Sequence, residues 1–157
     1  MNTDLMFSSA TDDWATPQDF FDKLNREFKF EVDVCASASN AKAPTFFDKE
    51  ANGLAQDWRG VCWMNPPYGR GIDAWMRKGY TSARENGATV VCLVPARTDT
   101  KWWHDYAARG EVFFVPGRLR FGDAKHNAPF PCAVVVFRPQ VAYAFAAAAI
   151  QEAREAV

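Results

Sequence analysis

The stretch Val61-Cys62-Trp63-Met64-Asn65-Pro66-Pro67-Tyr68-Gly69 joins a short apolar run to an abrupt turn. The run 61–64 is typical of a buried strand. The two successive prolines lack backbone N–H donors and have a fixed φ, so they end the strand and make the turn rigid. A turn of this kind holds whatever follows the strand in a fixed geometry at one end of a sheet.

The side chains of this turn favour a chemical role. The Asn65 amide and the Pro66 carbonyl form a rigid pair of hydrogen-bond acceptors, and the aromatic ring of Tyr68 lies two residues on. Two acceptors beside a ring suit a planar group bearing an NH₂, such as the Watson–Crick edge of adenine. A Pro-Pro turn that merely ends a strand explains the prolines, but it gives no reason for Asn before them and Tyr after them.

Outward from the turn, apolar strands alternate with amphipathic helices. We expect strands at 28–34, 61–64, 89–94, 111–115 and 132–137, with a short one inside 43–47. We expect helices from Pro17, with Thr16 as N-cap, and over 71–86, 100–108 and 141–157. This order predicts an α/β fold, a three-layer sandwich around a mostly parallel sheet. The loop 117–131 contains no helical pattern, so the last two strands are expected to pair antiparallel at one edge.

The chain has 157 residues, which predicts one domain over 14–157 after a flexible lead over 1–13. No run of about 18 apolar residues predicts a membrane span. The acidic, polar start does not fit a secretory signal, so we expect a cytoplasmic protein. The four cysteines form no CxxC pair and only two histidines occur, which argues against a metal site and favours buried free thiols.

The net charge of −1 hides an asymmetry along the chain. Residues 1–60 hold six Lys and Arg against eleven Asp and Glu, whereas residues 61–138 hold eleven against six. Any positive surface facing a nucleic acid should therefore come from the middle and second half.

Through the turn Asn65-Pro66-Pro67-Tyr68, the sequence resembles the amino-group methyltransferases with an (D/N)PP(Y/F) motif. It is most similar to the small, phage-encoded DNA N6-adenine methyltransferases. The resemblance covers roughly 14–138 and rests on Trp14-Ala-Thr16-Pro17, Asp33-Val-Cys35-Ala36, Gln56-Asp57-Trp58, Asn65–Gly69, Pro95-Ala-Arg97-Thr98 and the segment from Gly117 to Phe137. It implies a Rossmann-like methyltransferase sandwich, S-adenosylmethionine as cofactor, DNA as partner, and methyl transfer to adenine N6 after base flipping.

The resemblance also implies roles for individual residues. Those expected to hold the target amine and its ring are Asn65, Pro66, Pro67 and Tyr68. Those expected at the cofactor are Trp14, Thr16, Pro17, Asp33, Cys35, Ala36, Asp57 and Asn65. Those expected at DNA are Tyr68, Arg70, Arg97, Arg118, Arg120, Phe121 and Lys125. In the host cell of a phage, the cytoplasm would be the place of action.

Several of these roles have simpler alternatives. The segment 33–38 has no GxG after the strand, so an ordinary β-turn accounts for it almost as well as a cofactor loop. Asp57 could be a solvated acid, and Phe121 could pack beneath its loop. The chemistry could also serve RNA or a protein glutamine, or the fold could be a decayed module that binds nucleic acid without catalysis.

Overall fold

The protein is described here by a computed structural model that covers residues 14–156; the predicted flexible lead lies outside them. Six strands form one sheet in the order β2-β1-β3-β4-β6-β5. Their bounds are β1 (Val32–Asp33), β2 (Thr45–Phe46), β3 (Val61–Met64), β4 (Thr89–Pro95), β5 (Glu111–Phe114) and β6 (Cys132–Phe137). The strands β2, β1, β3 and β4 are mutually parallel, and β6 is antiparallel to both β4 and β5.

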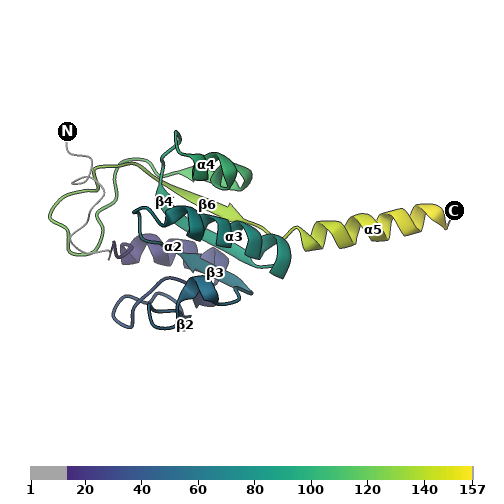
Figure 1. Ribbon diagram of the computed structural model, residues 1–157, viewed down its shortest axis with the longest axis horizontal. Helices are drawn as coiled ribbons and strands as arrows, with labels where there is room; N and C mark the ends of the chain where they lie inside the picture. The colour runs from purple at the N-terminus through teal and green to yellow at the C-terminus, as the bar shows by residue number, and fades with distance from the viewer. Residues whose placement is uncertain (1–13, 157) are drawn as a thin grey trace.

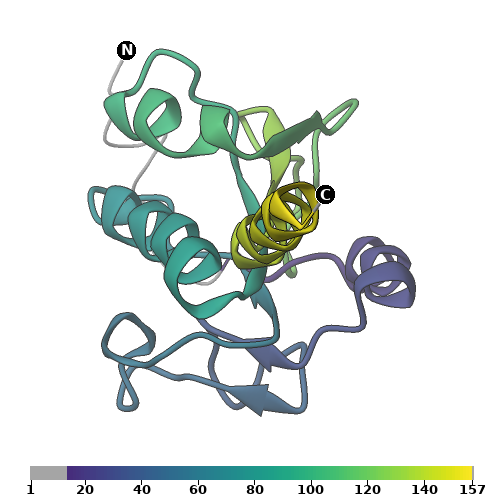
Figure 2. The same ribbon diagram turned by 90° about the vertical axis from the view of Figure 1, so that its right-hand side faces the viewer.

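Helices cover both faces of this sheet. Helix α2 (Gln18–Phe28) lies on one face, and α3 (Ile72–Asn86) with the short α4 (Lys101–Asp105) lies on the other, as Figure 2 shows. Two single turns, η1 (Gly53–Ala55) and η2 (Ala107–Arg109), complete the connections. Helix α5 (Val141–Glu155) extends away from the body in Figure 1. The predicted α/β sandwich is therefore confirmed, with the antiparallel pairing at the edge of the sheet.

The central strands carry the core because they are covered on both sides. Residues 90–95 of β4 and all six residues of β6 are buried. A strand covered on both faces should be apolar without alternation, and Val90-Val91-Cys92-Leu93-Val94 has this pattern. In the register of the pair, Cys92 of β4 lies opposite Val135 of β6. This core fixes the carboxyl ends of β1, β3 and β4 at one edge of the sheet.

Two local expectations differ from the structure. The predicted strand over 28–34 shrinks to Val32–Asp33, because Lys29 ends α2 in the left-handed conformation. The aromatic rings at 28 and 30 pack against each other instead of alternating along a strand. Thr16 does not cap α2, since Pro17 takes the N-cap position without a side-chain hydrogen bond. By contrast, the side chain of Thr100 accepts a hydrogen bond from the Trp103 backbone and caps α4 as predicted.

Candidate active site

The turn after β3 is held in place by burial and by a hydrogen bond from the segment after β4. Pro66 is fully buried and Tyr68 is almost so. The guanidinium of Arg97, from the segment after β4, donates a hydrogen bond of 2.9 Å to the Tyr68 carbonyl. Neighbouring parallel strands end at the same edge of a sheet, which is why residues so far apart in sequence meet here. The turn predicted from the two prolines is thus also held by a half-buried cation.

The Asn65 amide is engaged at both of its ends. Its Nδ2 donates to the backbone carbonyl of Trp14 at 2.6 Å and to the Thr16 hydroxyl at 3.0 Å. Its Oδ1 accepts from the Tyr68 hydroxyl at 2.6 Å. A carbonyl oxygen has two lone pairs, so Oδ1 can accept a second hydrogen bond.

The Tyr68 hydroxyl has one proton and two acceptors within reach. Asn65 Oδ1 lies at 2.6 Å, and the Leu93 carbonyl oxygen lies at 3.1 Å. Burial raises the pKa of Tyr68 well above its usual value, so the hydroxyl remains protonated at physiological pH. The proton can therefore pass between the two acceptors by rotation of the hydroxyl alone.

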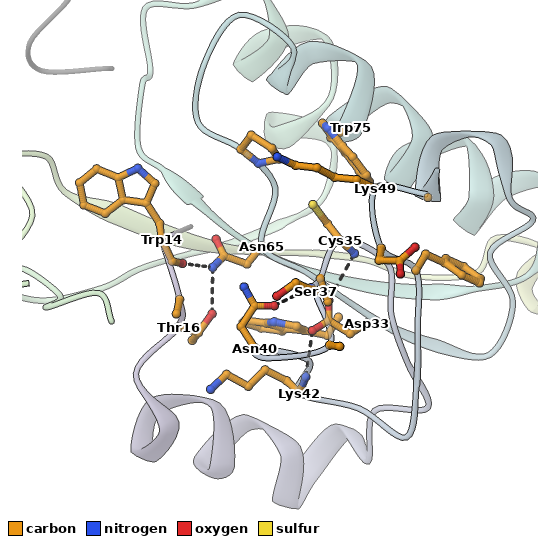
Figure 3. A pocket seen from close by; sticks show the side chains of 18 of the residues that line it. Trp14, Thr16, Asp33, Cys35, Ser37, Asn40, Lys42, Lys49, Asn65 and Trp75 are labelled. Carbon is orange, nitrogen blue, oxygen red and sulfur yellow. Dashed lines mark hydrogen bonds between the residues drawn. The ribbon is translucent and has the colours of Figure 1, made fainter. Parts of the chain in front are cut away.

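A cavity of about 480 Å³ opens beside Asn65. Figure 3 shows Trp14, Thr16 and Asn65 together along one side of it, while Trp75 and Lys49 lie across from them. This volume lies within the roughly 300–1,000 Å³ typical of ligand pockets. The predicted site residues that line it are Trp14, Thr16, Asp33, Cys35, Ala36, Asn65 and Pro67.

The loop after β1 forms the floor of the cavity, and a carboxylate organises it. Asp33 accepts hydrogen bonds from the backbone N–H of Cys35 at 3.3 Å and of Lys42 at 3.0 Å, so it ties both ends of the loop. Inside the loop, Asn40 Oδ1 accepts from the Ser37 N–H at 2.7 Å. Burial raises the pKa of Asp33 to about 6, although the two backbone hydrogen bonds oppose this shift.

A glycine still allows close approach in this cavity, but it comes from another segment. Gly53 of η1 lies so close to the end of β1 that a Cβ there would be 2.1 Å from the Val34 carbonyl oxygen. The Gly53 carbonyl in turn accepts from Nε1 of the buried Trp58. The missing Cβ of Gly53 thus lets η1 pack directly against the end of β1, beside the loop that Asp33 ties.

On the other side of Asn65, four rings form a compact group, here called the aromatic cluster: Trp14, Tyr68, Phe121 and Phe130. The Trp14 indole stacks on the Tyr68 ring, with centroids 6.3 Å apart and planes 20° from parallel. Phe121 and Phe130 meet both rings edge-on at 5.3–5.9 Å. Tyr68 and Phe121 are each only 3% exposed, so the ring expected to stack on a base is covered here by side chains of the same chain.

Two predicted cofactor residues do not reach the cavity. Asp57 is 76% exposed and faces Arg59 at 3.8 Å, outside the cavity lining, because the connection to β3 turns it toward solvent. Pro17 starts α2 and is also outside the lining. Besides Asp33, the acids that line the cavity are Asp48 and Glu50, which sequence reasoning missed. Their position just after the short strand β2 is the signal that could have identified them.

The predicted DNA residues divide into two groups. Arg70, Arg118, Arg120 and Lys125 are exposed on the loops that follow β3 and β5. Arg97 instead points inward to the Tyr68 carbonyl. Each loop contributes a ring to the aromatic cluster, since Tyr68 precedes Arg70 by two residues and contacts Phe121 of the loop 117–131.

Residues 14–156 contain neither a candidate metal site nor a candidate membrane span. In that part of the chain, no group of three or more His, Cys, Asp or Glu side chains is placed to hold a metal ion. Among the same residues, no helix combines the length and the apolar character needed to cross a membrane.

Comparison with known proteins agrees with this geometry. The family described as DNA N-6-adenine-methyltransferase (Dam) matches residues 5–148. A DNA N-6-adenine-methyltransferase of Haemophilus phage HP1 is 34% identical over 146 residues, which span 86% of this chain and 83% of the relative. A protein of the same name from Escherichia phage T1 is 26% identical over 134 residues, spanning 69% of this chain and 56% of the relative. The chain therefore belongs to the DNA N-6-adenine-methyltransferase family.

Proposed function

We propose that this chain transfers a methyl group from S-adenosylmethionine to N6 of an adenine that it takes out of DNA. The observation that carries the proposal is the place of Asn65. Its side chain lines the open cavity and is hydrogen-bonded to Tyr68 of the aromatic cluster, so it stands between a cofactor site and a base site. The family membership supports the same reaction.

The cavity lining fits S-adenosylmethionine by size and by chemistry. Asp48 and Glu50 are carboxylates suited to the ribose hydroxyls, and Trp63 and Trp75 offer apolar surface for the purine. We assign the methionine end to the neighbourhood of Trp14 and Thr16, and the middle of the cofactor to the loop 33–42. When bound, this cofactor supplies an electrophilic methyl group on a sulfonium.

The base site needs a rearrangement. Extruding a base from a duplex costs a few kcal/mol. Stacking on an aromatic side chain returns about 1–3 kcal/mol per ring. Tyr68 is the ring expected to receive the adenine, with Phe121 as the second contact, and the Trp14 indole now lies against the face of Tyr68. We infer that the indole moves aside when the base enters.

In the reaction, Asn65 Oδ1 and the Pro66 carbonyl accept the two hydrogens of the adenine amine. As the amine arrives at Oδ1, the Tyr68 proton turns to the Leu93 carbonyl, the second acceptor within its reach. With its two hydrogens held in this way, the amino nitrogen would present its lone pair to the methyl group, which the cofactor would supply with loss of a neutral thioether. The nitrogen becomes cationic and afterwards loses a proton to water, so no strong base is required.

The phosphate backbone of DNA would be held by the exposed cations on the two loops. Arg70, Arg118, Arg120 and Lys125 supply charge-assisted hydrogen bonds without reading the sequence. Arg97 acts differently, since it keeps the Tyr68 carbonyl and hence the turn in place. DNA and S-adenosylmethionine share the bacterial cytoplasm, and we expect the protein to act there.

The deciding experiment maps N6-methyladenine in DNA from cells that express the protein and lack adenine methylation of their own. The expected result is methylation at a short recurring sequence, which disappears when Asn65→Ala is expressed at the same level. A parallel assay offers tritiated S-adenosylmethionine to DNA, RNA and protein separately. Transfer to RNA or protein but not to DNA would contradict the proposal.

A further inference from the structure

A catalytic amide must face the right way, because its oxygen accepts hydrogen bonds and its nitrogen donates them. If Asn65 were turned over, its oxygen would lie 2.6 Å from the Trp14 carbonyl oxygen, and two acceptors at that distance repel each other. The Trp14 carbonyl therefore decides the sense of the amide. One acceptor on one hydrogen still lets the amide plane tilt, so a second contact is needed to fix the direction of Oδ1.

The second contact is the Thr16 hydroxyl. Its Oγ1 lies 3.0 Å from Asn65 Nδ2, and the residue is 4% exposed. The placement of Thr16 before a proline would suit a helix cap, yet its side chain leaves that position to Pro17 and turns to Asn65. The buried Thr16 hydroxyl makes no capping hydrogen bond and instead contacts a residue 49 positions away in the sequence. This contact indicates a role beyond the start of the helix.

We propose that Thr16 is a positioning residue, which holds the Asn65 amide plane so that Oδ1 stays aimed at the adenine amine. This inference rests on the proposed methyl transfer. Thr16 also lines the cofactor cavity, so its contact with Asn65 lies between the methyl donor and the methyl acceptor. An error in the direction of Oδ1 would leave both substrates bound and their reacting atoms misaligned, which slows the chemical step more than binding.

The test compares Thr16→Val, which keeps the shape and removes the hydroxyl, with Thr16→Ser, which keeps the hydroxyl. Methyl transfer is measured in a single turnover at saturating DNA and cofactor, and cofactor affinity is measured by calorimetry. We expect Thr16→Val to slow transfer about tenfold, the loss of one well-placed hydrogen bond. We expect Thr16→Ser to stay within about threefold of the parent rate, and both variants to keep cofactor affinity within about threefold.

A matched control removes a hydroxyl elsewhere. In helix α3 the Thr81 hydroxyl donates to the Lys78 carbonyl at 3.3 Å, so Thr81→Val loses a comparable contact far from the cavity. Its transfer rate should equal that of the parent chain. A rate for Thr16→Val equal to the parent, or an equal loss in Thr16→Val and Thr16→Ser, would overturn the proposal.

A second measurement does not depend on activity. In the free protein, the two side-chain N–H resonances of Asn65 should be well separated and protected from exchange with solvent, because both hydrogens are bonded. Removing the hydroxyl should shift and expose one of them, and resonances in Thr16→Val identical to those of the parent would overturn the proposal. If the parent chain methylates no DNA, the proposed function fails. If the parent methylates DNA and Thr16→Val matches it, only the positioning role fails.

Discussion

The two sides of Asn65 are built in opposite ways. Toward β1 and β2 the chain leaves an open cavity of about 480 Å³, with a polar floor tied by Asp33. Toward the loop 117–131 it closes the aromatic cluster, whose rings Tyr68 and Phe121 are 3% exposed. One side is ready to receive a ligand, and the other is filled by the protein itself.

This difference teaches how a small chain can handle two very different substrates. In the proposed function, the cofactor would enter a preformed cavity, which avoids the cost of ordering a loop on each binding event. An adenine reaches the site only when DNA is bound. Until then, the apolar face of Tyr68 is protected from water by Trp14, which stacks on it.

The largest effect is expected at Asn65, which lies between the cavity and the aromatic cluster. Asn65→Ala removes the acceptor for the target amine and should lower the transfer rate by about 10³-fold or more. The cavity loses little of its lining, so cofactor affinity should change only slightly. Calorimetry and single-turnover transfer on the same preparation measure both quantities. Joint loss of cofactor binding and transfer would show that Asn65 serves the cofactor side alone.

The next effect concerns the stability of the cavity floor. Burial raises the Asp33 pKa from 3.8 to about 6, so between these values the folded chain holds a proton that the unfolded chain has released. The free energy of unfolding should therefore fall as pH rises from 4 to 7, by up to about 3 kcal/mol from this carboxyl. Asp33→Asn lacks this dependence. Urea unfolding at both pH values, compared between parent and variant, measures it, and a difference independent of pH would contradict the prediction.

Removing the Trp14 indole from the aromatic cluster should make it easier for a base to enter there. In Trp14→Ala the backbone carbonyl that orients Asn65 remains, but the indole no longer covers Tyr68. Affinity for a single-stranded oligonucleotide containing adenine should rise about tenfold, because one aromatic contact of about 1–1.5 kcal/mol need not be broken. The affinity of Trp14→Phe for the same oligonucleotide should lie between those of Trp14→Ala and the parent. Weaker binding by Trp14→Ala would mean that the indole itself contacts DNA.

A smaller effect is expected from a single loop cation. Lys125→Ala should reduce the slope of log affinity against log salt concentration by about 0.9, the value for one phosphate contact. The control is Lys23→Ala, which removes an exposed lysine on helix α2. The slope of the control should equal that of the parent. A change of equal size in both variants would contradict a DNA surface formed by the loop 117–131.

The smallest effect is expected for cofactor affinity when Asp57 is substituted, and Glu50 provides the comparison. Asp57→Asn should change cofactor affinity by less than about twofold, because its carboxylate is 76% exposed and pairs with Arg59 on the surface. Glu50→Gln, which makes the same chemical change inside the cavity lining, should weaken cofactor binding by about fivefold, the net loss expected for one hydrogen bond. A larger loss of cofactor affinity in Asp57→Asn than in Glu50→Gln would indicate that Asp57, and not Glu50, contacts the cofactor.

Some of this architecture could be predicted from local sequence. Strand β3 begins and ends where the apolar run and the prolines indicate, and the helix predicted over 71–86 is found as α3 over Ile72–Asn86. These elements depend on signals contained within a few residues. The position of Asn65 at the end of β3 could be anticipated for the same reason, since the turn and its functional groups are contiguous, and its catalytic role stays a prediction.

Other features depend on contacts that local patterns do not contain. A threonine before a proline looks the same whether it caps a helix or contacts Asn65, and only the fold decides. Asp57 precedes Asn65 by eight residues, yet the chain between them turns it outward. The covered face of Tyr68 likewise depends on Trp14 and Phe130, which come from opposite ends of the domain.

The contact between Trp14 and Asn65, which joins residues 51 positions apart, also bears on the order of synthesis. While the ribosome extends the chain, β1 and β3 emerge well before Phe121 and Phe130, the last members of the aromatic cluster. Contacts between distant residues form later than local ones because a longer loop must close. A nascent or truncated chain can therefore have part of its sheet and no complete base site. Under the proposed function, we expect a chain truncated before Phe121 to lack the complete aromatic cluster and to transfer no methyl group to DNA.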